Sequence, residues 1–249
     1  MLRILAALIF FTRLPFWRLA EVPAVYFKNI VSLWPLAGWL TAGLMALVYY
    51  AASLCFPSQV ALLLAIFTRL LITGCLHEDG LADFFDGFGG GTNRERVLAI
   101  MKDSHIGSYG VIGLICYFLL LYTTLSALPA AWIGCVILAG DPFCKSVSAW
   151  IINFLPYARK AEEAKNKTVY SRMTMGEKVG CVVIGWLPLY WLPSPLYGWA
   201  ILFPLVVSGC LFRFMWRKIQ GYTGDCCGAT FLLTELSFYL GILLLYHLS

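Results

Sequence analysis

The chain is divided by one stretch, His77-Glu78-Asp79-Gly80-Leu81-Ala82-Asp83-Phe84-Phe85-Asp86-Gly87-Phe88-Gly89-Gly90-Gly91. Residues 77–110 hold six of the thirteen Asp and Glu side chains, and long apolar runs flank them on both sides. A helix needs about 20 apolar residues to cross a bilayer, and most of these runs are close to that length. An acidic, glycine-rich segment between membrane-length runs predicts a functional site in a membrane protein.

The composition is that of a polytopic membrane protein. Of the 249 residues, 61% are apolar and 12% are charged, and the mean hydropathy is +0.80, whereas a soluble domain has about 25% charged residues. We expect an all-α fold, a polytopic integral membrane helical bundle of about seven transmembrane helices, as a single domain over residues 1–249. Residues 1–29 carry an apolar run too short to span a bilayer. The seven expected spans are approximately residues 30–52, 58–76, 111–128, 130–152, 179–192, 196–212 and 229–248.

Lys and Arg are distributed unevenly between the segments that connect these spans. Sixteen of the eighteen lie in the N-terminal segment or in the polar segments 77–110, 153–178 and 213–228, and the other two, Arg69 and Lys145, lie inside spans. Positive residues mark the cytoplasmic side. We therefore expect the N-terminus and the three polar segments at the cytoplasmic face of a bacterial inner membrane, and the C-terminus outside. The net charge of +5 then reflects orientation and contact with lipid headgroups, and no nucleic-acid partner is expected.

Asp79, Asp83 and Asp86 have the spacing i, i+4, i+7, which puts them on one stripe of a helix, within about 60° of one another. Aligned carboxylates repel each other in a low-dielectric setting. Mg²⁺ relieves such repulsion, because it binds a few carboxylates and completes its shell with water and substrate phosphates. The stripe therefore predicts a Mg²⁺ site. The alternative is a solvated acidic face at the start of a helix. Glu78 points away from the stripe.

The glycines and basic residues that follow the stripe favour an anionic ligand. Gly89 and Gly90 allow close backbone approach and expose N–H groups to phosphate, with a hinge between two helical pieces as the alternative. Three basic residues are candidates for holding an anionic substrate, with a role as topology signals as the alternative. These are Arg94, Arg96 and Lys102.

Two further aspartates are candidate catalytic residues. Asp103 is a candidate metal ligand or general base, with a helix N-cap as the alternative. Asp225 is the only acid in a second glycine-rich loop, residues 221–228, in which Gly224 is a candidate substrate contact. Because the charge distribution places both loops on one face, we expect Asp225 and the aspartate stripe to share a site. A plain turn is the alternative for this loop.

Four ionisable residues lie inside apolar runs, where such residues are rare and usually paired. Asp141 and Lys145 are spaced i, i+4 and can pair with each other, and Arg69 and Glu235 are candidates for a second pair. A functional role and a purely structural pairing are both open for these four residues.

Four segments together resemble the cobalamin synthase family. They are His77 to Gly87 with the glycine run, Met101-Lys102-Asp103-Ser104-His105-Ile106-Gly107, Phe11-Thr12-Arg13-Leu14-Pro15, and Thr223-Gly224-Asp225 with Gly228. The resemblance covers the whole chain in order. Three positions depart from the family pattern, which has Leu in place of Glu78 and Arg in place of His105 and near Lys145.

The resemblance implies an adenosylcobinamide-GDP ribazoletransferase, a membrane enzyme of the last steps of cobalamin biosynthesis. A hydroxyl of α-ribazole, or of its 5′-phosphate, attacks the cobinamide-linked phosphate, GMP leaves, and adenosylcobalamin or its 5′-phosphate forms. The expected roles are Asp79, Asp83 and Asp86 as Mg²⁺ ligands, Asp103 and Asp225 as catalytic residues, and Gly89, Gly90, Arg94, Arg96, Lys102 and Gly224 as substrate contacts.

Two other classes of function fit parts of the pattern. A CDP-alcohol phosphotransferase or a polyprenyl-diphosphate enzyme also uses aspartate-rich motifs, although the chain lacks the full spacing of the former. A transporter usually keeps its ionisable residues near the membrane midplane, whereas these acids lie in polar segments at one face. The sequence leaves the oligomeric state open, a homo-oligomer included.

Overall fold

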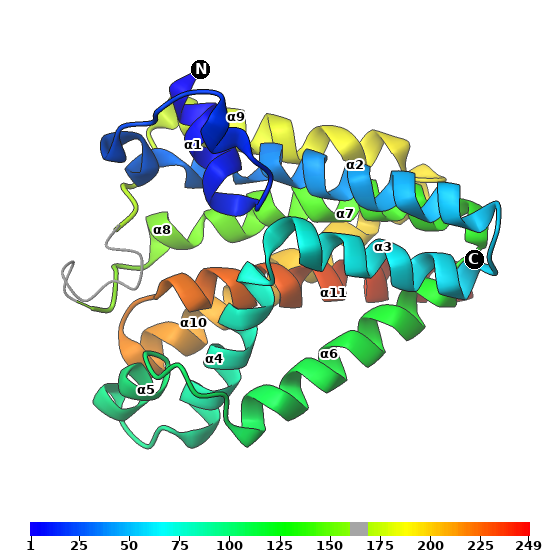
Figure 1. Ribbon diagram of the computed structural model, residues 1–249. Helices are drawn as coiled ribbons and strands as arrows, with labels where there is room; N and C mark the ends of the chain where they lie inside the picture. Colours follow the sequence, from blue (N-terminus) through cyan, green and yellow to red (C-terminus); the bar gives the residue numbers. More distant parts are fainter. Residues whose placement is uncertain (160–168) are drawn as a thin grey trace.

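The computed structural model describes residues 1–159 and 169–249, which form a bundle of helices (Figure 1). Within these residues no strand forms, and an isolated bridge joins Tyr157 to Tyr222, so the all-α prediction is confirmed. The α-helices are α1 (Leu2–Phe11), α2 (Trp34–Ser53), α3 (Ser58–Thr73), α4 (Leu76–Gly90), α5 (Arg94–Ile100), α6 (Ser108–Ser126), α7 (Ala130–Ala149), α8 (Ile151–Phe154), α9 (Met175–Trp186), α10 (Leu202–Ile219) and α11 (Gly224–Leu248). The 3-10 turns are η1 (Phe16–Arg18), η2 (Ala24–Asn29), η3 (Val31–Leu33), η5 (Leu187–Trp191) and η6 (Pro195–Ile201).

The described residues contain five helical segments that are long and apolar enough to cross a membrane, or six if the bent pair α3 and α4 counts as one span. Residues 179–192, which were expected to form one membrane span, do not form a single long helix. They fold as the end of the 12-residue α9 followed by η5. Pro188 lies at the start of η5, and proline lacks the N–H that would continue an α-helix. The five segments are Val31–Ser53, Ser108–Ser126, Ala130–Phe154, Pro195–Ile219 and Gly224–Leu248.

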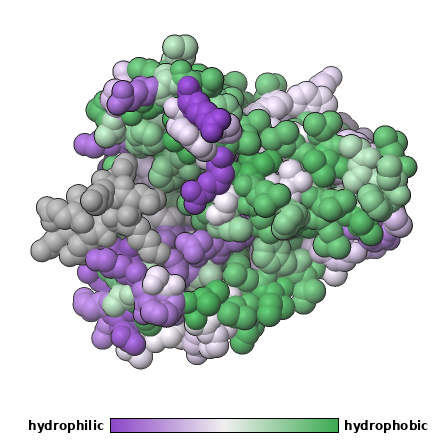
Figure 2. Space-filling view, in the orientation of Figure 1, coloured by the Kyte–Doolittle hydropathy of each residue, from purple (hydrophilic) through white to green (hydrophobic). Residues whose placement is uncertain are grey.

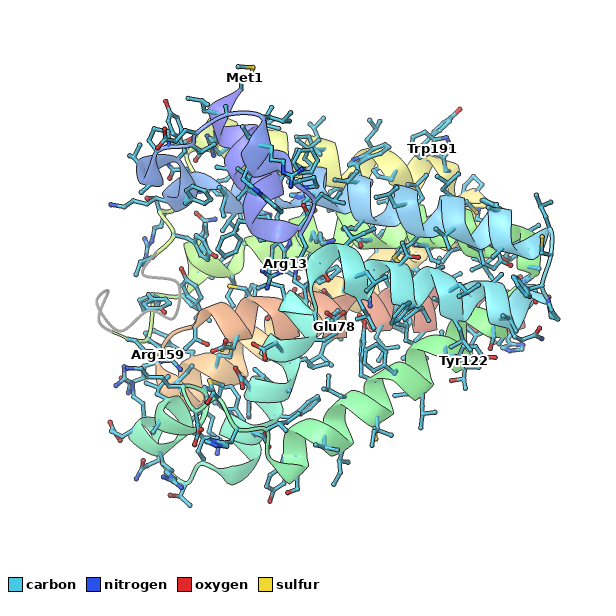
Figure 3. The ribbon with its side chains drawn as sticks, in the orientation of Figure 1. Met1, Arg13, Glu78, Tyr122, Arg159 and Trp191 are labelled. Atoms are coloured by element: carbon cyan, nitrogen blue, oxygen red, sulfur yellow. The ribbon has the colours of Figure 1, made fainter. Side chains whose placement is uncertain are left out.

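α3 and α4 meet at an angle of 88°. Gly74 and Cys75 both have left-handed backbones, with φ of 62° and 58°, and left-handed residues of this kind end helices. The N-terminal motif packs on this bend, because the N–H of Arg13 donates to the carbonyl of Ile72 at 2.6 Å. A Cβ at Gly74 would lie 2.4 Å from Nε of Arg13, so a larger residue at this left-handed position would strain the backbone and displace the Arg13 side chain. Figure 3 shows Arg13 beside the start of α4.

α4 packs on α11 with the two backbones nearly in contact. A Cβ added at Gly80 would lie 3.0 Å from the carbonyl oxygen of Asp225, and one added at Gly228 would lie 3.0 Å from that of His77. Small residues permit such close approach between membrane helices. This packing brings the acidic stretch and the second glycine-rich loop together, as the charge distribution predicted.

The polar connections gather at one end of the bundle. α5, residues 155–159 and the connection between α10 and α11 lie at the left in Figure 1, whereas the α2–α3 and α6–α7 turns and the C-terminus lie at the right. Hydrophilic residues cluster at the left end in Figure 2, and hydrophobic residues cover the middle. The site therefore lies at the polar end of an otherwise apolar bundle.

Candidate functional site

A cavity of ≈ 140 Å³ lies where the starts of α4 and α11 meet. We call it the aspartate cavity, because Asp79 and Asp225 both line it. The two polar loops, which were expected to share a site, each contribute one aspartate to this cavity. Its lining consists of Phe10, Phe11, Val31, Trp34, Leu76, His77, Asp79, Tyr157, Arg159, Tyr170, Gly224, Asp225, Cys227 and Gly228.

Two helix N-termini open on the aspartate cavity. α4 contributes residues 76, 77 and 79 to its wall, and α11 contributes Gly224 and Asp225. Thr223 caps α11, because its hydroxyl accepts a hydrogen bond from the N–H of Cys226 at 3.3 Å. Helix N-termini attract anions through their N–H groups and the helix dipole. Carboxylates and an anion can share such a site when a cation lies between them, which is the environment of a metal-bound phosphate.

Arg159 is the candidate site residue that the sequence analysis did not single out. Its Nη2 donates to the carbonyl of Leu98 at 3.1 Å and lies 4.0 Å from Oδ2 of Asp225. Its Nε is buried with no hydrogen-bond partner in the part of the chain that the structure describes. Figure 3 shows Arg159 at the polar end of the bundle. No local motif marks this arginine in the sequence, and only the fold brings it to the cavity.

A second cavity of ≈ 630 Å³ shares Tyr157 and Arg159 with the first. We call it the basic cavity, because Arg94, Lys102 and Arg159 line it. Two of the three basic residues predicted to contact substrate therefore reach one pocket. Arg94 is also structural, since it donates to the carbonyl oxygens of Ile219 at 2.9 Å and Ala158 at 2.7 Å and so ties α5 to the end of α10.

Asp86 is engaged away from the cavity. Its carboxylate oxygens accept hydrogen bonds from the N–H groups of Gly107 at 2.7 Å and Gly110 at 2.8 Å. These bonds satisfy N–H groups at the start of α6, which have no partner within the helix. The predicted stripe is thus divided: Asp79 lines the cavity, Asp83 lies half-buried one turn later, and Asp86 caps α6. Across residues 1–159 and 169–249, no group of three or more His, Cys, Asp and Glu residues is arranged to hold a metal.

The two glycines predicted to contact phosphate lie outside both cavities. A Cβ at Gly89 would lie 2.7 Å from the ring of Tyr109, and one at Gly90 would lie 3.4 Å from Cδ1 of Ile100. The glycine run therefore makes room for side chains of α5 and α6. It also lies at the C-terminal end of α4, where the helix dipole disfavours anions.

Asp103 and Arg96 also lie outside both cavities. Asp103 accepts hydrogen bonds from the backbone N–H of His105 at 3.0 Å and from its ring nitrogen Nδ1 at 2.7 Å. The hydrogen bond from the His105 side chain lowers the pKa of Asp103 below its ordinary value. Both side chains are largely exposed, and Arg96 is exposed on α5. Asp103 is thus placed in a surface loop, and the helix that follows is capped by Asp86 instead.

Both pairs predicted inside the apolar runs are present. Nη1 of Arg69 lies 2.6 Å from Oε2 of Glu235, and the ammonium of Lys145 contacts the carboxylate of Asp141. Glu78 is buried with Arg69 at 3.6 Å, and Figure 3 shows it in the interior below α3. Glu78 therefore belongs to the interior charge network, consistent with its exclusion from the aspartate stripe.

Fold and site together define a helical protein with membrane-length apolar segments and, at one end of its bundle, a cavity lined by two aspartates, an arginine and two helix N-termini. The family model for cobalamin-5-phosphate synthase matches residues 3–243, and the chain belongs to this family of enzymes. The predicted resemblance is confirmed.

Curated relatives named adenosylcobinamide-GDP ribazoletransferase match almost the whole chain. The relative from Shewanella amazonensis is 37% identical over 98% of this chain and 96% of its own length. Those from Vibrio parahaemolyticus and Leptospira interrogans are 33% and 34% identical, over 98% and 96% of this chain and 92% and 94% of their own lengths. No solved structure matches the chain.

Proposed function

We propose that this chain is an adenosylcobinamide-GDP ribazoletransferase that joins adenosylcobinamide-GDP to α-ribazole or its 5′-phosphate. A hydroxyl oxygen of α-ribazole attacks the cobinamide-linked phosphorus, and the bond from that phosphorus to the GMP oxygen breaks. The hydroxyl proton is lost, GMP leaves, and adenosylcobalamin or its 5′-phosphate forms. The curated names of the relatives support this reaction.

The observation that carries the proposal is the joint exposure of Asp79 and Asp225 on one cavity beside Arg159. Arg159 presents a guanidinium to the anionic diphosphate, which such groups bind well. The starts of α4 and α11 add backbone dipoles that favour the same charge. In-line transfer depends chiefly on positioning and charge neutralisation, and these residues supply both.

Mg²⁺ fits this site. Asp79 and Asp225 would hold it, with Asp83 one turn away on α4, and two carboxylates are enough because Mg²⁺ takes its other ligands from water and substrate phosphates. When bound, Mg²⁺ neutralises negative charge on the reacting phosphate. Two acids are too few to surround a metal ion with protein ligands alone. They agree better with a Mg²⁺ site in which water and the substrate phosphates supply the remaining ligands.

The polar end of the bundle is proposed to face the cytoplasm of a bacterial inner membrane. Sixteen of the eighteen Lys and Arg residues lie in the N-terminal segment or the three polar segments, and positive residues are retained on the cytoplasmic side. Substrates that are soluble and phosphorylated would then reach the site from the cytoplasm, while lipid covers the apolar middle.

The test uses the purified full-length protein in liposomes with adenosylcobinamide-GDP and α-ribazole, and measures GMP release. We expect release with Mg²⁺, none after chelation, and recovery when Mg²⁺ is restored. Asp79→Asn and Asp225→Asn are expected to lower the rate at least a hundredfold, whereas Glu21→Gln, at an exposed acid outside the lining of both cavities, leaves it unchanged. Turnover of a CDP-alcohol without GMP release from adenosylcobinamide-GDP would contradict the proposal.

A further inference from the structure

The aspartate cavity has a polar part and an aromatic part. Asp79, Asp225 and Arg159 form the polar part. The aromatic part, which we call the aromatic compartment, is formed by Phe10, Phe11, Trp34, His77, Tyr157 and Tyr170. Phosphate chemistry uses only the polar part, so the aromatic compartment calls for a second explanation.

The aromatic compartment is built from α1, α2, α4 and two segments that contain Tyr157 and Tyr170. Phe11 of α1 stacks on Trp34 of α2, with ring centroids 5.4 Å apart and planes 11° apart, and Trp34 in turn stacks on His77 of α4 at 5.6 Å. Phe10 meets Tyr170 edge to face at 6.1 Å. Burial raises the pKa of Tyr157 and of Tyr170 above the ordinary tyrosine value, so both rings are neutral phenols.

Two residues of the compartment carry buried polar atoms that lack hydrogen bonds. Neither ring nitrogen of His77 has a hydrogen-bond partner, and neither does Nε1 of Trp34, within the described residues. Both residues are only 2% exposed. A buried polar group without a partner destabilises the fold, and each such group in a native structure calls for an explanation. A ligand with a polar edge would satisfy these atoms.

We propose that the aromatic compartment binds the planar nitrogen-heterocyclic base of α-ribazole, with the ribose directed toward Asp79 and Asp225. This inference rests on the proposed function. The aspartate cavity has a volume of ≈ 140 Å³ with its polar part included, which is of the order that a planar aromatic ring requires, since an apolar cavity of about 150 Å³ holds benzene. Aromatic walls stack on such rings, and His77 and Trp34 offer the few polar contacts that a mostly apolar base requires.

The same placement distributes the two substrates between the two cavities. The base of α-ribazole occupies the aromatic compartment, while the diphosphate of adenosylcobinamide-GDP enters through the basic cavity past Arg94 and Lys102. Arg159 lies in the wall between them, where the attacking hydroxyl and the phosphorus meet. The arrangement also assigns a function to the N-terminal motif, since Phe11 begins that motif and closes one side of the compartment.

The inference is tested by calorimetric binding of α-ribazole, and separately of GMP, to the full-length protein in detergent. Tyr170→Leu removes a stacking ring and is expected to raise the Kd for α-ribazole on the order of tenfold. Trp34→Phe keeps a ring but removes the indole N–H. It is expected to raise the Kd for α-ribazole about fivefold, which corresponds to the loss of one hydrogen bond. The Kd for GMP should stay unchanged in both variants.

A matched control lies on the same helix. Trp39 of α2 donates its indole N–H to the carbonyl of Ile184 at 2.9 Å and lies outside the cavity lining, so Trp39→Phe should leave the Kd for α-ribazole unchanged. An unchanged α-ribazole Kd in Tyr170→Leu overturns the inference, as does a selective loss of GMP binding, which would place guanine in the compartment.

Asp225→Asn separates this inference from the proposed function. Because the base makes most of the binding contacts and the amide of asparagine can still face the ribose, that variant should keep the Kd for α-ribazole within a few-fold of wild type while its rate of GMP release falls at least a hundredfold. Wild-type protein that releases GMP but shows no effect of the compartment variants on Kd or KM for α-ribazole overturns the inference alone. Wild-type protein that releases no GMP overturns the proposed function.

Discussion

Arg69 of α3 and Glu235 of α11 lie 166 positions apart in the sequence, and their side chains meet 2.6 Å apart inside the bundle. The hydroxyl of Tyr117 accepts a hydrogen bond from Arg69 at 2.8 Å, and the hydroxyl of Tyr239 donates one to Glu235 at 3.0 Å. Both charged side chains are completely buried. Charged groups in such surroundings are retained when they are paired, so this pair ties the bent α3–α4 unit to the helix that carries Asp225.

Removal of one partner of this pair should destabilise the fold strongly. Glu235→Gln removes the nearer of the two carboxylates that face Arg69, since Glu78 stays at 3.6 Å, and breaking a buried pair costs about 3–5 kcal/mol. We expect a lower midpoint of thermal unfolding in detergent, measured by circular dichroism. The double variant Arg69→Met with Glu235→Leu should not recover the loss, because it leaves the buried Glu78 carboxylate without the Arg69 guanidinium. Equal midpoints for wild type and Glu235→Gln would exclude a stabilising pair.

Asp86→Ala should destabilise the junction of α4 and α6 without affecting metal dependence. It leaves the buried N–H of Gly110 and the N–H of Gly107 without their acceptor, at about 1–3 kcal/mol for each group that stays unpaired. The readouts are the unfolding midpoint and the Mg²⁺ concentration that gives half-maximal GMP release. If the Mg²⁺ concentration for half-maximal GMP release shifts while the unfolding midpoint stays unchanged, Asp86 is a metal ligand, as its spacing predicted.

Gly228→Ala should impair activity by separating α4 from α11. The added Cβ lies 3.0 Å from the carbonyl oxygen of His77, and relief of such overpacking costs about 1–3 kcal/mol. Because Asp79 and Asp225 lie on these two helices, we expect a lower kcat together with a lower unfolding midpoint. Gly209→Ala on α10 is the matched control, since its Cβ would meet no atom within 4 Å. Wild-type kcat in Gly228→Ala would show that this close approach is not needed.

Asp103→Asn tests a residue that the sequence predicted to be catalytic and that the structure places outside both cavities. Asp103 is bonded to His105 in an exposed loop, so we expect GMP release within about threefold of wild type, as surface changes away from a site rarely exceed ±0.5 kcal/mol. A loss of a hundredfold with unchanged folding would reinstate Asp103 as a catalytic residue.

Reporter fusions test the orientation of the bundle. A reporter fused after Ser249 should read as external, because the C-terminus lies at the end opposite the polar connections (Figure 1). One inserted after Lys165, which lies outside the described residues, should read as cytoplasmic. The reverse pattern would place the aspartate cavity on the outer face and contradict the proposed access of its substrates from the cytoplasm.

Periodicity and charge distribution predicted the parts of the molecule that depend on local rules. The apolar runs became helices, and the two interior pairs formed as expected, because unpaired charges are excluded from an apolar interior. The i, i+4, i+7 rule placed Asp79, Asp83 and Asp86 on one face of α4, but it could not show that α6 would start against Asp86. Arg159 and the aromatic compartment depend on contacts between distant segments, which no local pattern encodes.

The left-handed pair Gly74 and Cys75 has a consequence for the order in which the site can form. A non-glycine residue in this conformation costs about 1–2 kcal/mol, so the isolated sequence would not hold the bend at Cys75 unaided. Contacts made by Arg13 with Ile72 and Gly74 stabilise it, and Arg13 precedes α3 and α4 in the chain and is therefore synthesised before them. The N-terminal motif is thus available as a template before α4 emerges, so truncation of the N-terminus should abolish assembly of the site even though all its aspartates remain.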